Sequence, residues 1–366
     1  MMIAKRIAPP SQFRHWTWRY AVDQTLDPSE IRARRAEAPK LRDRDIAENL
    51  GVSEAQLVAA HCGHGATRIA AHPDRIMPLV EHLGEVMALT RNTSCVHETI
   101  GAYSNYHPGE HAAMVLAEQI DLRMFPSHWR HAFCVEHEVE DGVRRSIQVF
   151  DAAGDAVHKI FLRDRSTEKA WDRVRAALTL EDQSEWQSVE QRLPVERPKT
   201  APDKVEILRK EWSRMTDTHQ FLRLVSKLKM NRLGAYRVAE RRYARQLGTD
   251  AVDALLHRLR DSGTEVMVFV GNRGCIQIHS GPIKTLRTMG PWQNVMDPDF
   301  NLHLRLDHIA EVWDIDKPTQ RGMVTSLEAF DAEGAMILQI FGVPKEGKDS
   351  REAFRAIVRD LEGVAA

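Results

Sequence analysis

Apolar residues recur at helical spacing through residues 205–227, and one histidine interrupts them. The positions that follow one another at steps of three and four are Leu208, Trp212, Met215, His219, Leu222 and Val225. Residues at this spacing share one face of a helix, so the pattern predicts a continuous helix whose apolar stripe packs in a core. His219 has two explanations: a buried histidine satisfied by its neighbours, or a ligand facing a large apolar group. Periodicity alone favours the buried histidine.

The remaining pattern predicts short strands joined by tight turns, with helices beside them. In the first half we expect a helical segment over 39–60, strands over 86–89, 147–150 and 157–162, and a closing helix over 167–178. In the second half we expect a helix over 233–247, strands over 266–270 and 275–279, a hairpin over 325–341 and a closing helix over 354–361. Because hairpins dominate, the predicted fold class is α+β, with mainly antiparallel sheets flanked by helices.

The order of elements repeats because the sequence itself repeats. Glu85–Met87 recurs as Glu265–Met267, an offset of 180 residues (265 − 85). The same ungapped offset pairs Asn92 with Asn272, Cys95 with Cys275, His128 with His308 and Phe150–Ala152 with Phe330–Ala332. Identities held in one register over such a length predict a tandem structural repeat.

Prolines mark the boundary between the repeats. We place an N-terminal extension at 1–25, the first repeat at 26–192, a linker at 193–204 and the second repeat at 205–366. Pro194, Pro198 and Pro202 lie among charged residues, a composition typical of a solvated tether, so we expect relative motion of the halves. Two duplicated halves also create a cleft between them, and domain interfaces are preferred binding sites.

Composition limits the class of protein. With 366 residues, 43% hydrophobic and 28% charged, the chain is expected to be soluble and to bury more than one core. No apolar run approaches the roughly 20 residues that span a bilayer, and residues 1–19 lack the apolar stretch of a secretory signal. The four cysteines form no Cys-x-x-Cys pair, and the net charge of −1 exerts no global attraction on nucleic acid. We expect a cytoplasmic protein without membrane insertion.

One segment permits a different function. Residues 44–58 have the pattern of a helix-turn-helix, with a turn at Leu50–Val52 and Ser53 placed to cap the second helix. In a DNA-binding regulator that helix would read base edges, but it opens on Glu54 and carries few hydrogen-bond donors. A plain helical hairpin is favoured, and DNA binding is kept as the alternative function.

The two repeats differ at a few polar positions. Arg123 of the first repeat corresponds to His303 of the second, and Lys159 corresponds to Gln339. No histidine of the first repeat corresponds to His219. Duplication tends to keep the fold and to leave the function unequal, so this difference favours a site at His219.

Four motifs carry a resemblance to a known family. They are Trp212 followed by Met215–Phe221, then Glu265–Cys275, Lys317–Thr319 and Thr325–Glu328. With these motifs and its duplicated architecture, the chain resembles the cytoplasmic haemin transport and degradation factors of the HemS/HmuS type, which serve bacterial haem uptake. The similarity covers nearly the whole chain beyond the N-terminal extension.

The resemblance implies a haem site in the cleft between the halves. His219 would be the axial ligand of the haem iron, and Arg123, with Phe125 beside it, would lie over the opposite haem face. Neutral imidazole is a good ligand for haem iron, whereas arginine stays protonated and would donate hydrogen bonds. The resemblance further implies Arg232 and Lys317 at the haem propionates, Phe269 and Phe341 as apolar walls, and a contact from Gln339.

The chain departs from the family pattern near its last predicted strand. The usual Gln-x-Tyr-Gly-x-Arg stretch reads Gln339–Pro344, with Phe341 in place of the tyrosine and Pro344 in place of the arginine. A phenol hydroxyl and a cation are lost. Lys345, one residue later, is the candidate to replace the arginine.

One haem site would permit two outcomes. As a carrier, the chain would hold haem through His219, with a haem oxygenase or the cytoplasmic side of a haem importer as its partner. As an enzyme, it would degrade haem and release iron, with Arg123 as the distal catalytic residue and an external electron donor. The sequence leaves both open, because it contains no reductase-binding or nicotinamide motif.

Overall fold

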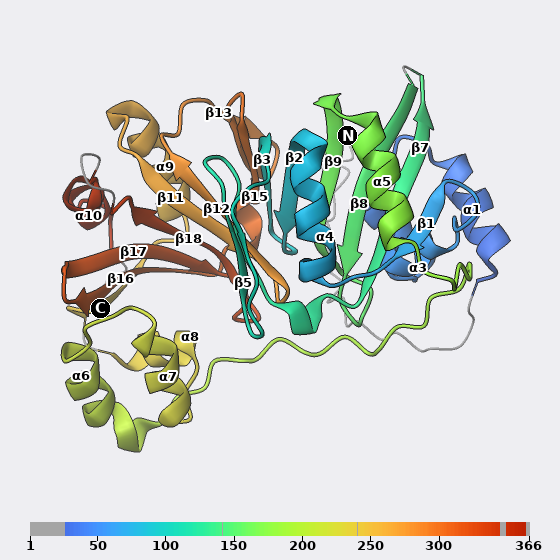
Figure 1. Ribbon diagram of the computed structural model, residues 1–366. Coiled ribbons are helices and arrows are strands. Elements are labelled where there is room, and N and C mark those ends of the chain that lie inside the picture. The colour runs from blue at the N-terminus through green and yellow to red at the C-terminus, as the bar shows by residue number, and fades with distance from the viewer. Residues whose placement is uncertain (1–25, 141, 240, 345–348, 364–366) are drawn as a thin grey trace, which may run out of the picture.

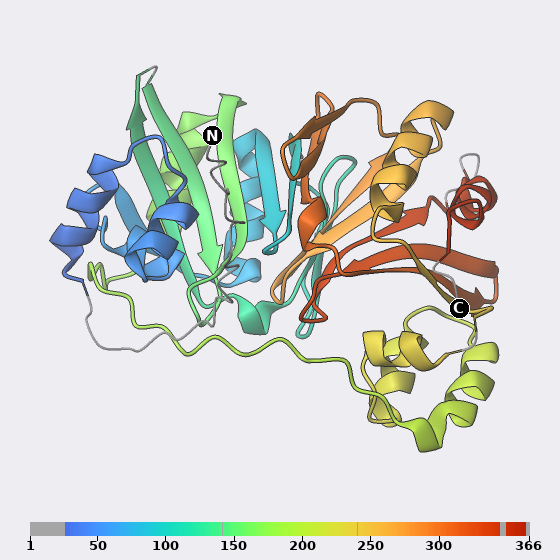
Figure 2. The ribbon, with the colours of Figure 1, turned by 180° about the vertical axis from the view of Figure 1, so that it is seen from behind.

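The computed structural model describes residues 26–140, 142–239, 241–344 and 349–363. The predicted N-terminal extension and Lys345 lie outside these residues. Within them the chain forms two nine-stranded antiparallel sheets with helices packed on both faces (Figures 1 and 2). The predicted α+β tandem repeat is confirmed.

The two sheets have the same architecture. The first has the strand order β1-β7-β8-β9-β2-β3-β15-β14-β13 and the second the order β10-β16-β17-β18-β11-β12-β6-β5-β4. The first sheet consists of β1 (Ala66–Ile69), β2 (Gly84–Arg91), β3 (Cys95–Ala102), β7 (His131–Val139), β8 (Gly142–Phe150), β9 (Ala156–Ser166), β13 (Leu286–Met289), β14 (Trp292–Met296) and β15 (Phe300–Arg305). The second consists of β4 (Tyr106–His107), β5 (Ala113–Leu116), β6 (Asp121–Met124), β10 (Ala244–Leu247), β11 (Val266–Gly271), β12 (Cys275–Gly281), β16 (Glu311–Thr319), β17 (Gly322–Phe330) and β18 (Met336–Gly342).

The last three strands of each sheet are exchanged between the halves. Strand β6 of the first half pairs with β12 of the second, with Arg123 opposite Ile276, and β15 of the second half pairs with β3 of the first, with Phe300 opposite Thr99. The exchanged strands still bury apolar side chains in the core of their own half, as Val115 does in the first. Hydrogen bonding to one half and packing in the other interlock the two repeats. This interlock opposes the relative motion that we expected from the linker.

Helices pack against both faces of each sheet. The first half contains α1 (Pro28–Glu37), α2 (Asp43–Leu50), α3 (Glu54–Ala59), α4 (Pro73–Val80) and α5 (Glu168–Leu178). The second half contains α6 (Val205–Ser213), α7 (Gln220–Lys227), α8 (Arg232–Val238), α9 (Ala251–Ser262) and α10 (Arg351–Arg359). Helices α4 and α5 pack in the main core of the first half, and α9 and α10 in that of the second. The opposite sheet faces carry α1–α3 and α6–α8 (Figures 1 and 2).

Two predicted helices are interrupted. The segment 205–227 forms α6 and α7 with a turn between them, and the segment 233–247 leaves the helical conformation after Val238 and ends as β10. Strand β10 pairs antiparallel with β16, with Leu247 opposite Val312. Pairing at the sheet edge therefore overrides the local helical preference of these residues.

A long strap joins the two halves along one side of the molecule (Figure 1). Residues 180–201 contain no helix or strand, yet they are docked. The Asn231 side chain donates to the Arg197 carbonyl oxygen at 2.8 Å and accepts from the Lys199 N–H at 2.9 Å. A Cβ on Gly234 would lie 1.8 Å from the Lys199 carbonyl oxygen, so only glycine permits this approach. The linker is exposed along most of its length, as expected, but the hydrogen bonds at Arg197 and Lys199 hold it against the second half.

Candidate functional site

One face of the second sheet gathers several of the residues singled out by sequence. Paired residues on neighbouring strands lie on the same face, as do alternate residues of one strand. Arg123 pairs with Ile276, and Ile276 pairs with Gly271. Phe269 lies two residues before Gly271 on β11 and pairs with Gln339. Phe341 lies two residues beyond Gln339 on β18. Arg123, Phe269, Gln339 and Phe341 therefore share one face, which we call the site face. Arg123 belongs to it because β6 is exchanged.

Helices α6–α8 pack on the adjoining part of the same face. Glu328 and Trp313 continue the site face through β17 and β16. Trp313 is buried in a cluster with Trp212 of α6 and Phe221 of α7. The rings of Trp212 and Phe221 meet edge to face, with their centroids 4.6 Å apart. The helices that carry His219 are thereby anchored beside the site face.

His219 lies directly before α7, in the turn that separates α7 from α6. Its backbone N–H donates to Asp217 Oδ1 at 2.7 Å, and the Thr216 N–H donates to Gln220 Oε1 at 2.9 Å. Such side chains offer the backbone an alternative to helical hydrogen bonds, which explains the break. The His219 ring is exposed and forms no hydrogen bond with any residue that the structure describes. The explanation of His219 as a satisfied buried histidine is therefore wrong.

The apolar stripe is buried only in part. Trp212 and Met215 are buried, but Leu222 exposes 52% of its surface. The turn before α7 changes the direction of the helix, so Phe221 takes the inward position that a continuous helix would give to Leu222. Leu222 therefore does not help to anchor α7.

Arg123 is partly exposed and is held by its own strand. Its guanidinium pairs with Asp121 and donates to the Leu122 carbonyl oxygen at 3.1 Å. Phe125 follows β6, and its N–H donates to the Gly274 carbonyl oxygen at 3.0 Å, which extends the pairing of the exchanged strand. Arg123 thus presents charged hydrogen-bond donors on the site face, with Asp121 as a neighbouring counter-charge.

Arg232 and Lys317 meet at one buried carboxylate. Glu328 is fully buried; it accepts from Arg232 Nη1 at 3.0 Å, from Lys317 Nζ at 3.0 Å and from the Tyr236 hydroxyl at 2.8 Å. Burial on its own would raise the pKa of Glu328, but the charges of Lys317 and Arg232 outweigh burial and hold this pKa at about 2. Two cations against one carboxylate leave an excess positive charge beside the site face.

Sequence reasoning singled out Arg232 and Lys317 but missed the residues that hold them. A signal for Glu328 was present, because it is a lone carboxylate in the otherwise apolar stretch Leu327–Phe330. Tyr236 lies in a helix with no distinguishing pattern, and its role depends on tertiary packing.

Phe269 and Phe341 form an aromatic pair on the site face. Their ring centroids lie 5.0 Å apart at an interplanar angle of 64°. Both rings and Gln339 are partly exposed, so they are accessible to a ligand. Phe341 retains the ring of the family pattern without its hydroxyl, and Pro344 is exposed.

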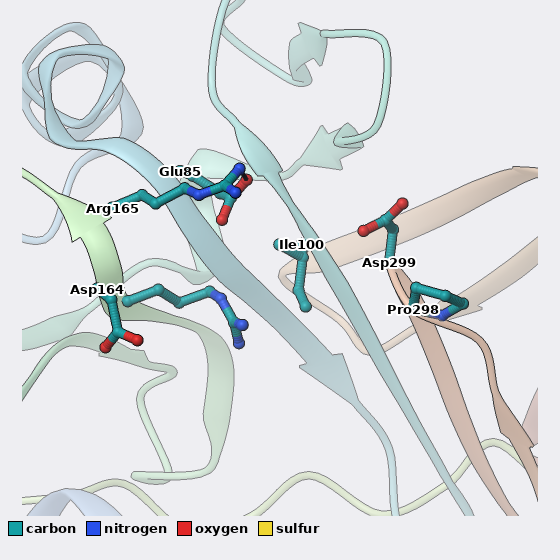
Figure 3. A pocket seen from close by; sticks show the side chains of 7 residues that line it. Glu85, Ile100, Asp164, Arg165, Pro298 and Asp299 are labelled. Atoms are coloured by element: carbon teal, nitrogen blue, oxygen red, sulfur yellow. Dashed lines mark ion pairs between the residues drawn. The ribbon is translucent and has the colours of Figure 1, made fainter.

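Two hollows in the surface differ in their relation to these residues. A groove of about 650 Å³ between the strap, α7, α8 and the β17–β18 turn is lined by residues that include Leu222, Val225, Arg232, Phe330 and Met336. A polar cleft of about 280 Å³ is lined by Glu85, Ile100, Arg163, Asp164, Arg165, Pro298 and Asp299 (Figure 3). None of the candidate site residues lines the polar cleft. The groove, in contrast, is lined by Arg232 and by residues of α7.

The family can be decided from the whole chain. The model of the haemin-degrading HemS.ChuX domain matches residues 51–178 and again residues 229–361. The chain belongs to this haemin-degrading domain family. The double match corresponds to the two interlocked halves.

Members of the family resemble the chain over most of its length. The hemin transport protein HmuS of Yersinia pestis is 38% identical over 328 residues, which cover 89% of this chain and 94% of that protein. Holo-PhuS, a heme-binding protein from Pseudomonas aeruginosa, superposes with a TM-score of 0.88 at 39% identity over 93% of this chain and all of that one. ChuS, described as an E. coli heme oxygenase, superposes with a TM-score of 0.81 at 33% identity over 91% of this chain and 99% of that one.

The structure opposes the alternative of a DNA-binding regulator. Helices α2 and α3 form the expected hairpin, and Ser53 caps α3 by accepting from the Gln56 N–H at 3.2 Å. However, α3 is largely buried, and Glu54 accepts from Lys159 Nζ at 2.8 Å inside the first half. A helix packed in this way cannot enter a DNA groove.

Across the described part of the chain, no three side chains of the usual ligand types gather at a candidate metal centre. The helices among these residues are too short or too polar to cross a bilayer.

Proposed function

We propose that the chain binds haem on the site face and holds its iron through His219. The observation that carries this proposal is the exposed His219 ring, which is engaged by no described residue and belongs to helices packed on the same sheet face as Phe269, Phe341 and Arg123. Neutral imidazole is a common axial ligand of haem iron. The named relatives that bind or transport haem support this reading.

The chemistry of the site face fits haem in three respects. Phe269 and Phe341 offer aromatic surface to an apolar macrocycle. Arg232 and Lys317 exceed the single charge of Glu328, so the region favours the anionic propionates. Gln339, the cross-strand partner of Phe269, adds a polar contact.

Arg123 and Phe125 would lie on the side of the haem opposite His219. A guanidinium stays protonated, so Arg123 would donate hydrogen bonds to a small molecule bound there and would not act as a base. Haem binding would have to compete with Asp121 for this guanidinium. Lys345, one residue beyond Pro344, is proposed as an additional cation for the propionates.

We propose that the chain works in the cytoplasm, where it either passes haem to a separate oxygenase or degrades it with electrons from an external donor. The first role follows the relatives named as hemin transport proteins, and the second follows the relative described as a heme oxygenase. Arg123 on the site face favours keeping the second role, since a distal donor is what such chemistry requires.

A haemin titration of the wild type and His219→Ala, followed by absorbance, tests the site. We expect the variant to bind haemin at least tenfold more weakly. His137→Ala, at an exposed histidine of β7 in the other sheet, is the matched control and should behave as the wild type. An unchanged spectrum and affinity in His219→Ala would disprove the assignment of the ligand.

A further inference from the structure

The exchanged hairpin extends the site face beyond Arg123. The register pairs Arg123 of β6 with Met114 of β5, and Met114 with His107 of β4. The three side chains therefore project from the same face in one row. Neighbouring strands lie about 4.8 Å apart, so the backbone of His107 lies roughly 10 Å from that of Arg123.

The side chains of His107 and Met114 in this row are accessible. His107 is exposed and Met114 partly exposed, whereas their neighbours Ala113 and Val115 are buried in the core of the first half. Within the described residues, no hydrogen bond or ion pair engages the His107 ring. The row is thus a free imidazole and a thioether next to the proposed distal arginine.

The other sheet has a different row at the equivalent positions. An offset of 180 residues leads from His107, Met114 and Arg123 to Arg287, Asn294 and His303. There Asn294 connects the row: its Nδ2 donates to the backbone carbonyl oxygen of Arg287 at 2.7 Å, and its Oδ1 lies 2.7 Å from His303 Nδ1. Only the row on the site face combines an unengaged imidazole with an apolar neighbour.

We propose that His107 is a second, rim ligand for haem iron, which holds haem before it reaches His219 or after it leaves. Imidazole and thioether are both ligands of haem iron in proteins, and Met114 between His107 and Arg123 also offers apolar surface to the macrocycle. Haem held by His107 would be displaced along the face by about two strand spacings. This inference rests on the proposed haem site.

The residual binding of His219→Ala tests the proposal at equilibrium. We expect this variant to retain a weaker haem complex with the absorption and electron paramagnetic resonance of histidine coordination. In His107→Ala/His219→Ala that signature should disappear, and the affinity should fall at least tenfold further. The matched control is His111→Ala/His219→Ala, because His111 is exposed in the same hairpin but outside its ladder.

Kinetics test the same ligand in the intact site. We expect His107→Ala alone to slow haemin association several-fold in stopped flow and to change the final spectrum little, while His111→Ala changes neither. Residual coordination in His107→Ala/His219→Ala equal to that in His219→Ala would overturn the proposal. A second pair of results would also overturn it: residual coordination that is lost in Met114→Leu/His219→Ala but kept in His107→Ala/His219→Ala. The Met114 thioether would then be the ligand. Failure of the wild type to bind haemin would instead reject the proposed function itself.

Discussion

Asn92 and Asn272 form reciprocal hydrogen bonds across the two repeats. Asn92 Nδ2 donates to the Ile337 carbonyl oxygen at 2.8 Å, and Asn272 Nδ2 donates to the Val157 carbonyl oxygen at 2.9 Å. Each Oδ1 meanwhile accepts backbone N–H groups of its own turn, including that of Cys275 at 3.0 Å for Asn272. Each asparagine therefore shapes a turn in one half and holds a strand of the other.

Asn272→Ala should destabilise the whole protein. A hydrogen bond contributes roughly 1 kcal/mol, and unsatisfied buried partners add to the loss, so we expect about 2–4 kcal/mol of unfolding free energy to disappear. Urea denaturation followed by circular dichroism measures the change. Asn49→Ala, at an exposed position of α2, should change stability by less than about 0.5 kcal/mol. Equal losses of stability in the two variants would contradict the role of Asn272 in holding the two halves together.

Glu328→Gln should leave Arg232 and Lys317 without their buried counter-charge. Breaking a buried ion pair typically costs about 3–5 kcal/mol, so we expect the unfolding free energy to fall by this amount at neutral pH. Glu206→Gln, which removes an exposed carboxylate on α6, should cost roughly a tenth of this. Urea denaturation of both variants provides the comparison. An unchanged unfolding free energy in Glu328→Gln would show that the network contributes little to stability.

The cost of Glu328→Gln should depend on pH. The native carboxyl has a pKa of about 2, below its ordinary value of 4.5, so its stabilisation is fully present above about pH 4.5 and is lost as the pH falls through 2. The difference between wild type and variant should therefore shrink from pH 5 towards pH 2. Denaturation curves at several pH values test this trend, and a constant difference would show that Glu328 does not titrate as stated.

Arg123→Ala should separate haem binding from haem degradation. We expect its haemin affinity to stay within about tenfold of the wild type, because the proposed iron ligand, His219, would lie on the other side of the haem. With a reductant, oxygen and catalase, loss of the Soret band should be at least tenfold slower than in the wild type. Equal rates would remove the distal role of Arg123. A wild type whose Soret band persists would be a carrier.

Phe341→Tyr should restore the hydroxyl of the family pattern. Phe341 is partly exposed beside Phe269, so a hydroxyl can reach solvent or a propionate without disturbing the core. One additional hydrogen bond of roughly 0.5–1.5 kcal/mol would raise haemin affinity about two- to tenfold. Phe161→Tyr, at the equivalent, partly exposed position of β9 in the other sheet, serves as the control. A drop in affinity for Phe341→Tyr would show that the site has no room for the hydroxyl group.

The repeat was predictable from sequence because its register survives without a gap, and the antiparallel sheets followed from the hairpins within it. The exchange of strands was not predictable. Alternation defines which residues face a core, but it is the same whether β6 pairs with its own half or with β12. The turn before His219 was missed because its apolar spacing imitates a helix, while the capping by Asp217 competes with helical hydrogen bonds only locally. The partners of Arg232 depend on contacts between α8 and β17, which no local pattern contains.

The strand exchange also determines the order in which the protein can fold during its synthesis. Strand β6 ends at Met124, and its partner β12 begins at Cys275, 151 residues later (275 − 124). Strand β3 likewise cannot pair along its free edge until β15, which ends at Arg305, has been synthesised. During synthesis, the first half therefore exposes the unpaired edges of β3 and β6 until most of the second half has been made. Truncation between the repeats should yield an aggregation-prone fragment, since each half supplies the edge strands that the other needs.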